Sequence, residues 1–430
     1  MAPLEGRRLV GQTGVMARVL SRDTRLLVTG QAVRGLGYGF TSVVLGATLA
    51  QRGVGAMTAG LLLATLIAGS ALASLVVGAY ADRFGRRRSY ALFFLGVAVA
   101  GTIVALNPPL WVLFCVAITG TLSTDVVDNG AASTLEQVML ATEDAGTGRV
   151  YGRYNAAGAA FGALGALGAA GAGTSAHGAA GHAGLFLALV PVGLAGVLCA
   201  WGLTSLVESP VERGRVTGAR ARATLGPSRA VVRRLATLFA VDAAGGGLVT
   251  TGFLSYYMVE RYGVSLVSLG WLFFFVSMMQ SVSVLAAPVL ARRCGLVPTM
   301  VWTHLPSNVV MASMVFAPNF AVAAALLLLR TTMSQMDTPT RQALIMTITT
   351  PAERTPAAAM TNAARYSVRP VAPLVAGALQ GFGLGVPLLV AGVVKGSYDL
   401  ALWRWARRVP AMRAPGVLRR RANPDDAPAS

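Results

Sequence analysis

The stretch Gly78-Ala79-Tyr80-Ala81-Asp82-Arg83-Phe84-Gly85-Arg86-Arg87-Arg88 lies between two long apolar runs, residues 57–77 and 89–106. An apolar run of roughly 20 residues is long enough to cross a bilayer as a helix. The stretch is therefore predicted to be a short polar turn between two membrane helices. Its four arginines favour the cytoplasmic side of a membrane, where basic residues concentrate.

The composition is that of a membrane protein. Of the 430 residues, 54% are hydrophobic and only 12% are charged, whereas soluble domains carry about 25% charged residues. The net charge of +19 does not predict nucleic-acid binding, because the arginines form clusters between apolar runs rather than one basic face. The 50 glycines favour closely packed membrane helices, since small residues let helix backbones approach one another.

The apolar runs predict an all-α integral membrane protein with twelve transmembrane helices in two pseudo-symmetric six-helix bundles. The predicted spans are 26–50, 57–80, 89–106, 109–132, 154–173, 184–206, 235–259, 267–290, 297–316, 320–341, 358–381 and 384–403. Of the 36 basic residues, two lie in the predicted outer loops and five lie inside spans, which leaves 29 on the inner side. This asymmetry predicts that both termini are cytoplasmic.

The two halves align weakly at an offset of 210 residues, as expected for a transporter built from parallel repeats. The matching pairs are Gly53 with Gly263, Gly60 with Gly270 and Gly85 with Gly295. The predicted organisation is a cytoplasmic N-terminal segment (1–25), a six-helix bundle (26–207), a cytoplasmic linker (208–234), a second six-helix bundle (235–403) and a cytoplasmic basic tail (404–430).

The spacing Gly-x-x-x-Asp-Arg-x-Gly-Arg-Arg in the first stretch resembles the loop 2–3 signature of the major facilitator superfamily of secondary transporters. Two further segments, 337–342 and 395–399, are similar to segments of drug-exporter-like members. The resemblance implies a bacterial inner-membrane transporter that works by alternating access around a cavity lined by spans 1, 4, 7 and 10. It also implies a cytoplasmic latch between the halves, with a purely topogenic turn as the alternative; its residues are Gly78, Asp82, Arg83, Gly85, Arg86 and Arg87.

Span 4 contains no arginine and span 5 contains no proline, which departs from the proton-coupled drug exporters of this family.

Charged residues inside the spans are candidates for substrate or proton binding, because burying an unpaired charge costs at least ~2.5–3.5 kcal/mol. Arg34 in span 1 and Asp242 in span 7 lie at similar depths, about 11–12 Å from the cytoplasmic boundary. Spans 1 and 7 are symmetry mates, so the two side chains are hypothesised to pair across the cavity. Such a pair could bind substrate or a proton, or it could be a fixed salt bridge.

Spans 4 and 10 supply further candidates. Asp125 and Asp128 are three residues apart on one helix face, a spacing that suits proton binding. Asp128 is expected to be solvated at the cytoplasmic end, and the role of Asp125 stays open. Arg330, near the middle of span 10, is expected to serve the cavity, and Asp337 joins the candidates for substrate or proton coupling.

Four charged residues are expected at the inner rim of the cavity: Glu136, Arg341, Arg365 and Arg369. Arg369 is predicted to lie in the membrane and to face Asp82 or Glu136. Lys395 and Asp399, four residues apart, are expected to form an intrahelical pair away from the cavity. His304 is expected to be a packing residue.

The sequence has no nucleophile–base arrangement, phosphate-binding loop or metal-ligand spacing, so we expect no enzyme activity, cofactor or metal. The leading hypothesis is secondary active transport of a small solute, with efflux of a hydrophobic or amphipathic compound favoured and protons as the hypothesised coupling ion. The expected partners are that solute and the lipid bilayer. The protein is expected to be a monomer and to bind no nucleic acid. The alternatives are a passive facilitator without ion coupling and a membrane sensor or scaffold that has lost transport.

Overall fold

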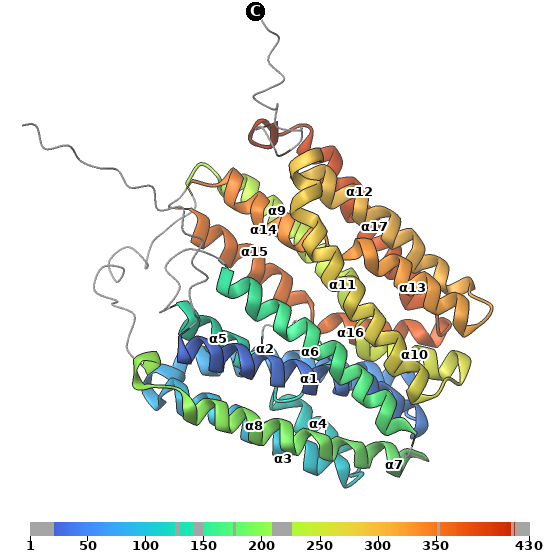
Figure 1. Cartoon of the computed structure of the whole chain (residues 1–430). Coiled ribbons are helices and arrows are strands. Elements are labelled where there is room, and N and C mark those ends of the chain that lie inside the picture. The colour runs from blue at the N-terminus through green and yellow to red at the C-terminus, as the bar shows by residue number, and fades with distance from the viewer. Residues whose placement is uncertain are drawn as a thin grey trace, which may run out of the picture.

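The computed structural model describes residues 21–124, 130–141, 149–174, 178–208, 226–350, 353–413 and 417, and every regular element in these ranges is a helix (Figure 1). The first half contains α1 (Arg22–Gln51), α2 (Ala56–Phe84), α3 (Arg86–Ala105), α4 (Leu110–Ile118), α5 (Ala131–Ala141), α6 (Arg149–Gly173), α7 (Gly178–Gly184), η1 (Leu185–Ala188), α8 (Leu189–Gly202) and η2 (Ser205–Glu208). The second half contains α9 (Arg229–Gly247), α10 (Thr251–Tyr262), α11 (Leu266–Cys294), α12 (Leu296–Ser313), η5 (Met314–Phe316), α13 (Phe320–Ser334), α14 (Asp337–Ile348), α15 (Arg354–Val368), α16 (Val371–Leu379), η6 (Gln380–Phe382), α17 (Val386–Ala406) and η7 (Pro410–Arg413).

The helices follow the predicted spans, each of which overlaps one helix or successive helices. Figure 1 shows α1, α3 and α8 side by side along the bottom, α12, α13 and α17 together at the upper right, and α6 and α11 where these two groups meet. Within the described residues, seven helical stretches are long and apolar enough to cross a membrane: Ala56–Val77, Arg86–Ala105, Arg153–Gly173, Ala180–Gly202, Arg229–Tyr262, Leu266–Cys294 and Val386–Ala406.

The fourth predicted span is not one helix, which corrects the prediction for residues 109–132. α4 ends at Ile118, and Gly120 has a φ of 69°, a left-handed conformation that ends a helix and favours glycine. Gly120 also packs against the backbone of α2, since a Cβ there would lie 2.5 Å from the carbonyl oxygen of Gly69. The next described helix, α5, begins only at Ala131.

Three other predicted spans also contain breaks, at residues 248–250, 335–336 and 369–370. Thr250 caps α10 by accepting a hydrogen bond of 3.2 Å from the N–H of Phe253. Pro370 explains the end of α15, because proline has no N–H and its ring obstructs the preceding turn. Breaks at membrane depth are tolerated where protein surrounds them or where they line a water-filled cavity.

The repeat at an offset of 210 is visible in the backbone. α2 and α11 each contain 29 residues and match at this offset over their full lengths. Gly53 and Gly263 have φ values of 63° and 62°, and Gly85 and Gly295 have φ values of 101° and 100°. These values lie in the region that favours glycine, so the matching glycines mark equivalent turns in the two halves.

The halves approach each other closely at the end that carries Gly53 and Gly263, called here the far end. The end that carries Gly85 and Gly295 is called the motif end. A Cβ at Gly46 of α1 would lie 2.6 Å from the Cβ of Ser255 on α10. A Cβ at Gly60 of α2 would lie 2.5 Å from the carbonyl oxygen of Pro373 on α16. Glycine is therefore required for the helices of the two halves to touch there.

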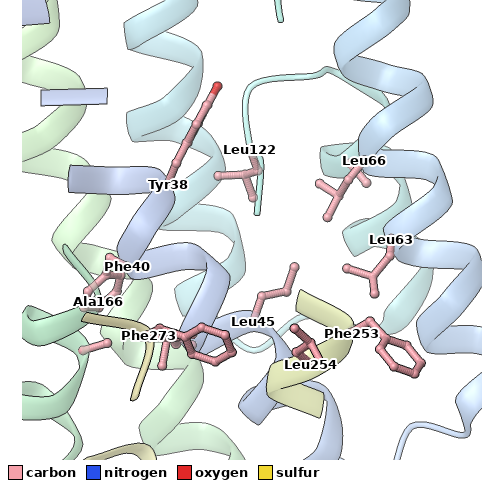
Figure 2. Close-up of a cluster of buried hydrophobic side chains, with 14 of the residues drawn as sticks. Tyr38, Phe40, Leu45, Leu63, Leu66, Leu122, Ala166, Phe253, Leu254 and Phe273 are labelled. Carbon is pink, nitrogen blue, oxygen red and sulfur yellow. The ribbon is translucent and has the colours of Figure 1, made fainter. Parts of the chain in front are cut away.

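Apolar side chains from both halves fill the space beside these glycine contacts (Figure 2). Leu45 of α1, Leu63 of α2, and Phe253 and Leu254 of α10 are buried members of one core cluster. In Figure 2 they lie together in the lower part of the view, whereas the hydroxyl of Tyr38 points away from them. The far end is thus closed by packed side chains contributed by both halves.

Candidate functional site

A buried ion pair lies inside the first half, between Arg34 of α1 and Glu136 of α5. The Arg34 Nη2 atom is 2.9 Å from Glu136 Oε2, and the two side chains are 2% and 0% exposed. The hydroxyls of Tyr90 and Tyr154 each donate a hydrogen bond of 2.5 Å to the same carboxylate. One cation and two hydroxyls, from α1, α3 and α6, therefore hold the Glu136 carboxylate; we call these four residues the Glu136 cluster.

The predicted Arg34–Asp242 pair is wrong, because Arg34 binds Glu136 and Asp242 binds Lys395 in the other half. The local packing explains the direction of Arg34. Gly30, one turn earlier on α1, leaves room for the Tyr90 side chain. A Cβ at residue 30 would overlap the Tyr90 hydroxyl. Glu136 does not pair with Arg369, since its partners are Arg34, Tyr90 and Tyr154.

A second buried network, in the other half, centres on Asp242 of α9. Lys395 of α17 donates a hydrogen bond of 2.6 Å from Nζ to Asp242 Oδ1. The Arg341 Nη1 atom of α14 lies 3.5 Å from Asp242 Oδ2 and 2.7 Å from Asp337 Oδ2. We call these four buried residues the Asp242 cluster. Gly245 makes the first contact possible, because a Cβ there would lie 2.6 Å from the Cγ of Lys395.

His304 of α12 connects the Asp242 cluster with a third carboxylate, Asp399 of α17. His304 Nδ1 is 3.0 Å from Asp399 Oδ1, and His304 Nε2 is 3.9 Å from Asp242 Oδ1. Asn308 donates a hydrogen bond of 2.9 Å to Asp399 Oδ2. The expectation of an isolated Lys395–Asp399 pair is therefore wrong, since these neighbours on α17 reach different helices. His304 is more than a packing residue, because it lies between two carboxylates.

Two other arginines in the second half, Arg330 on α13 and Arg365 on α15, have a buried Nε atom without a hydrogen-bond partner among the described residues. Arg365 lies close enough to Asp242, Asp337 and Arg341 for their charges to act on it. Arg330 has no such charged neighbour in the described part of the chain.

The turn at the motif end is held within the first half. Glu208, in η2, accepts hydrogen bonds of 2.8 and 3.0 Å from the backbone N–H groups of Arg86 and Arg87, and so caps α3. The Arg86 guanidinium donates to the carbonyl oxygen of Val207 (3.2 Å) and is buried, so it is directed into the first half rather than toward the membrane surface. The side chain of Asp82 lies outside the described part of the structure, and the latch stays a prediction.

Glu353 holds the motif end of the second half. Its carboxylate accepts hydrogen bonds from the Ser228 hydroxyl (2.8 Å), the Ser228 N–H (3.2 Å) and the Thr350 hydroxyl (2.9 Å). These hydrogen bonds, that of the Ser228 hydroxyl foremost, hold the pKa of the Glu353 carboxyl below its usual value. They therefore stabilise the fold above the ordinary glutamate pKa, and this contribution is lost as the pH falls through the lowered pKa.

Some candidates and partners were beyond sequence reasoning. Asp125 and Asp128 lie outside the described residues. The tyrosines of the Glu136 cluster gave no signal, because tyrosine is common in membrane helices. His304 and Asn308 did carry one, since they lie four residues apart in an apolar run. In the described parts of the chain, no group of three or more His, Cys, Asp or Glu side chains is placed to hold a metal ion.

Comparison with known proteins agrees with this architecture. The family model of the Major Facilitator Superfamily matches residues 27–373. The chain belongs to this superfamily. An uncharacterized membrane protein of Saccharomyces cerevisiae is 24% identical over 400 residues, which cover 85% of this chain and 89% of the yeast protein.

Solved transporters of this superfamily share the fold. A D-xylose-proton symporter superposes with a TM-score of 0.69 at 16% identity, covering 91% of this chain and 99% of its own. The inward-open xylose transporter XylE from E. coli gives a TM-score of 0.67 at 14% identity, covering 92% and 99%. The nucleoside transporter NupG gives 0.68 at 12% identity, covering 89% and 97%. The chain is therefore a multi-pass membrane transporter of the superfamily, a class that is generally not enzymatic.

Proposed function

We propose that the protein moves a small solute across the bacterial inner membrane by alternating access between two six-helix bundles. The proposal includes twelve spans, cytoplasmic termini, a drug-exporter-like character and a monomeric state. The arginine asymmetry of the sequence supports the orientation, with the motif end on the inside. Membership of the superfamily supports transport itself.

The observation that carries the proposal is the Asp242 cluster, because buried ionisable groups in a membrane protein are expensive to keep and mark transport pathways. Its members come from α9, α14 and α17, and two of these helices adjoin breaks in the backbone. Broken helices surround the substrate and ion sites of many transporters. The Glu136 carboxylate is instead fully enclosed by three partners of its own half, Arg34, Tyr90 and Tyr154, which favours a structural role.

The arrangement of the halves supports an inward-facing state. Glycine contacts and the apolar cluster join the halves at the far end, where Tyr256 also donates a hydrogen bond of 3.0 Å to the carbonyl oxygen of Val54. With the motif end on the inside, such a state opens toward the cytoplasm. The opposite state would require the contacts of Gly46 and Gly60 to separate.

Coupling to protons through Asp242 and His304 is part of the proposal. A protonated imidazole donates from both ring nitrogens, which suits a histidine between two carboxylates, whereas a neutral one donates from one nitrogen only. A proton gained or lost at this network would change the charge beside Asp242, which already binds Lys395 and Arg341. We favour efflux of an amphipathic solute as the direction.

The test is flux in proteoliposomes with a compound found by a thermal-shift ligand screen on the purified protein. We expect an imposed proton gradient to drive accumulation, and Asp242→Asn to abolish this dependence. Asp23→Asn is the matched control, because Asp23 binds Thr204 away from the cluster. Unchanged gradient-driven flux in Asp242→Asn would overturn the coupling role of this residue.

The second candidate is a passive facilitator, which the absence of an arginine from span 4 favours. This case is identified if the wild-type protein only equilibrates the compound across the membrane and the rate of flux does not depend on the proton gradient. A sensor or scaffold, the third candidate, would bind the compound and move none.

A further inference from the structure

We propose that Arg330 binds an anionic group of the transported solute, a carboxylate or another oxyanion. This inference rests on the proposed transport function and names the class of its substrate.

Arg330 differs from the buried cations of the membrane-embedded helices, because its side chain is only partly buried although its Nε atom is shielded from solvent. Arg34 is paired with Glu136 at 2.9 Å, Lys395 with Asp242 at 2.6 Å and Arg341 with Asp337 at 2.7 Å. Each of these cations therefore has a carboxylate within ion-pair distance. Arg330 has none within the described residues, and its Nε atom is buried without a hydrogen-bond partner.

An arginine cannot resolve this situation by losing its proton, because a guanidinium stays charged in proteins. A buried lysine or histidine could become neutral instead. Because the side chain is partly exposed and no carboxylate of the described chain pairs with it, the charge of Arg330 is available to an anion from outside the chain. Arg365 is a weaker candidate for the same role, because the carboxylates of Asp242 and Asp337 already act on it.

The position of Arg330 on α13 argues against a lipid-facing side chain. Successive residues of an α-helix are turned by about 100°. The face of α13 that carries Leu329 is exposed, and Leu329 itself is 51% exposed. Arg330 is turned about 100° from Leu329 and lies near the side of the buried residues Ala323 and Ser334. The guanidinium is therefore directed toward protein rather than toward lipid.

A second orphaned group lies one turn further along the same helix. The hydroxyl of Ser334 is buried and has no hydrogen-bond partner within the described part of the chain. A guanidinium and a hydroxyl at i and i+4 lie on the same side of a helix. A carboxylate accepts hydrogen bonds from both groups, because each of its oxygens has two acceptor positions. One oxyanion would satisfy Arg330 and Ser334 together.

The surroundings also indicate the rest of the solute. Residues 323–329 of α13, which lead to Arg330, are all alanine or leucine. An anion bound there lies beside apolar side chains, so the solute is expected to be amphipathic, with one oxyanion and an apolar body.

The test measures binding without flux, in nanodiscs of phosphatidylcholine that contain no anionic lipid. The probes are sodium octanoate, sodium benzoate and the neutral octanamide, read as shifts of the thermal unfolding midpoint. We expect octanoate or benzoate to stabilise the wild-type protein and octanamide to have little effect. Arg330→Gln should weaken binding of the anion roughly 10- to 100-fold, the usual cost of losing charged hydrogen bonds. Arg330→Lys should retain part of the binding, and Arg293→Gln, at an exposed position, should match the wild type.

Several results would overturn the proposal. They are equal stabilisation by octanamide, no stabilisation by either anion, and unchanged anion binding in Arg330→Gln. If phosphatidylglycerol in the nanodisc stabilises only proteins with Arg330, the oxyanion is a lipid headgroup and the assignment to the solute fails. If Asp125→Asn and Arg330→Gln each lower the unfolding midpoint equally, and the double variant lowers it no further, the anion that binds Arg330 is a residue of the chain.

A protein that binds octanoate through Arg330 but moves no solute in liposomes would refute the transport proposal and leave this inference intact.

Discussion

Replacing Glu136 by glutamine tests whether the Glu136 cluster is a structural element of the first half. The carboxylate is fully buried and accepts hydrogen bonds from Arg34 (2.9 Å), Tyr90 (2.5 Å) and Tyr154 (2.5 Å). Glutamine keeps the shape and one acceptor oxygen, but it leaves the Arg34 guanidinium without an anion. Removing one partner of a buried ion pair typically costs ~3–5 kcal/mol. We expect Glu136→Gln to lower the free energy of unfolding by that amount.

The measurement is reversible unfolding in mixed detergent micelles, followed by circular dichroism. Glu260→Gln is the control, because Glu260 is exposed on α10 and a surface substitution changes stability by about 0.5 kcal/mol or less. A loss below about 1 kcal/mol in Glu136→Gln would refute the reasoning, since it would mean that the guanidinium finds another acceptor.

A double variant separates structure from function. Replacing both Arg34 and Glu136 by methionine removes both charges, and apolar replacement of a buried pair is often close to neutral. We expect the double variant to be more stable than Glu136→Gln and to retain flux. A stable double variant that has lost flux would show that the Glu136 cluster takes part in transport.

Three further outcomes are expected. Gly46→Ala should shift the protein away from the state in which the far end is closed, because the new Cβ would lie 2.6 Å from Ser255 Cβ. Cysteine crosslinking between the two halves measures this shift. Gly168→Ala is the control, because a Cβ at residue 168 would have no atom within 4 Å. Glu208→Gln should cost about 0.5–2 kcal/mol through weaker capping of α3, and equal stability in chemical unfolding would contradict the cap. The Glu353 carboxyl has a lowered pKa, so its contribution to the free energy of unfolding is lost as the pH falls below about 4.5. The stabilities of the wild-type and Glu353→Gln proteins, measured by unfolding at a series of pH values, should therefore be equal at low pH and differ near neutrality.

The helices and the repeat could be predicted from the sequence because their signals are local. An apolar run of membrane length gives a helix whatever its neighbours are, and glycines at matching positions mark turns with positive φ, as at Gly85 and Gly295. The break after Ile118 was missed, because an apolar run does not reveal that its backbone packs against α2. The break at Pro370 was predictable in principle, since proline interrupts a helix.

The ion pairs could not be predicted, because they depend on the direction in which each helix turns its side chains. The similar depth of Arg34 and Asp242 and the symmetry of spans 1 and 7 do not say whether a side chain points toward the other half or into its own bundle. Arg34 finds its acceptor 102 residues away, and Asp242 finds Lys395 153 residues away. Sequence spacing also misled for Lys395 and Asp399, whose proximity on α17 did not make them partners.

The stretch at residues 78–88 has a different meaning once the contacts of the two halves are compared. The helix after Gly85 is capped by the carboxylate of Glu208, whereas the helix after Gly295 is capped by a backbone group, the carbonyl oxygen of Val417, which accepts from Val297 N–H at 3.0 Å. At an offset of 210, Glu208 matches residue 418, so both caps come from the chain that follows the last α-helix of their half, α8 or α17. A backbone carbonyl survives any substitution, but the Glu208 cap depends on one side chain at the start of the linker. Changes in the linker are therefore expected to act on the first half's turn through Glu208, whereas the described residues of the second half place a backbone carbonyl at the corresponding turn.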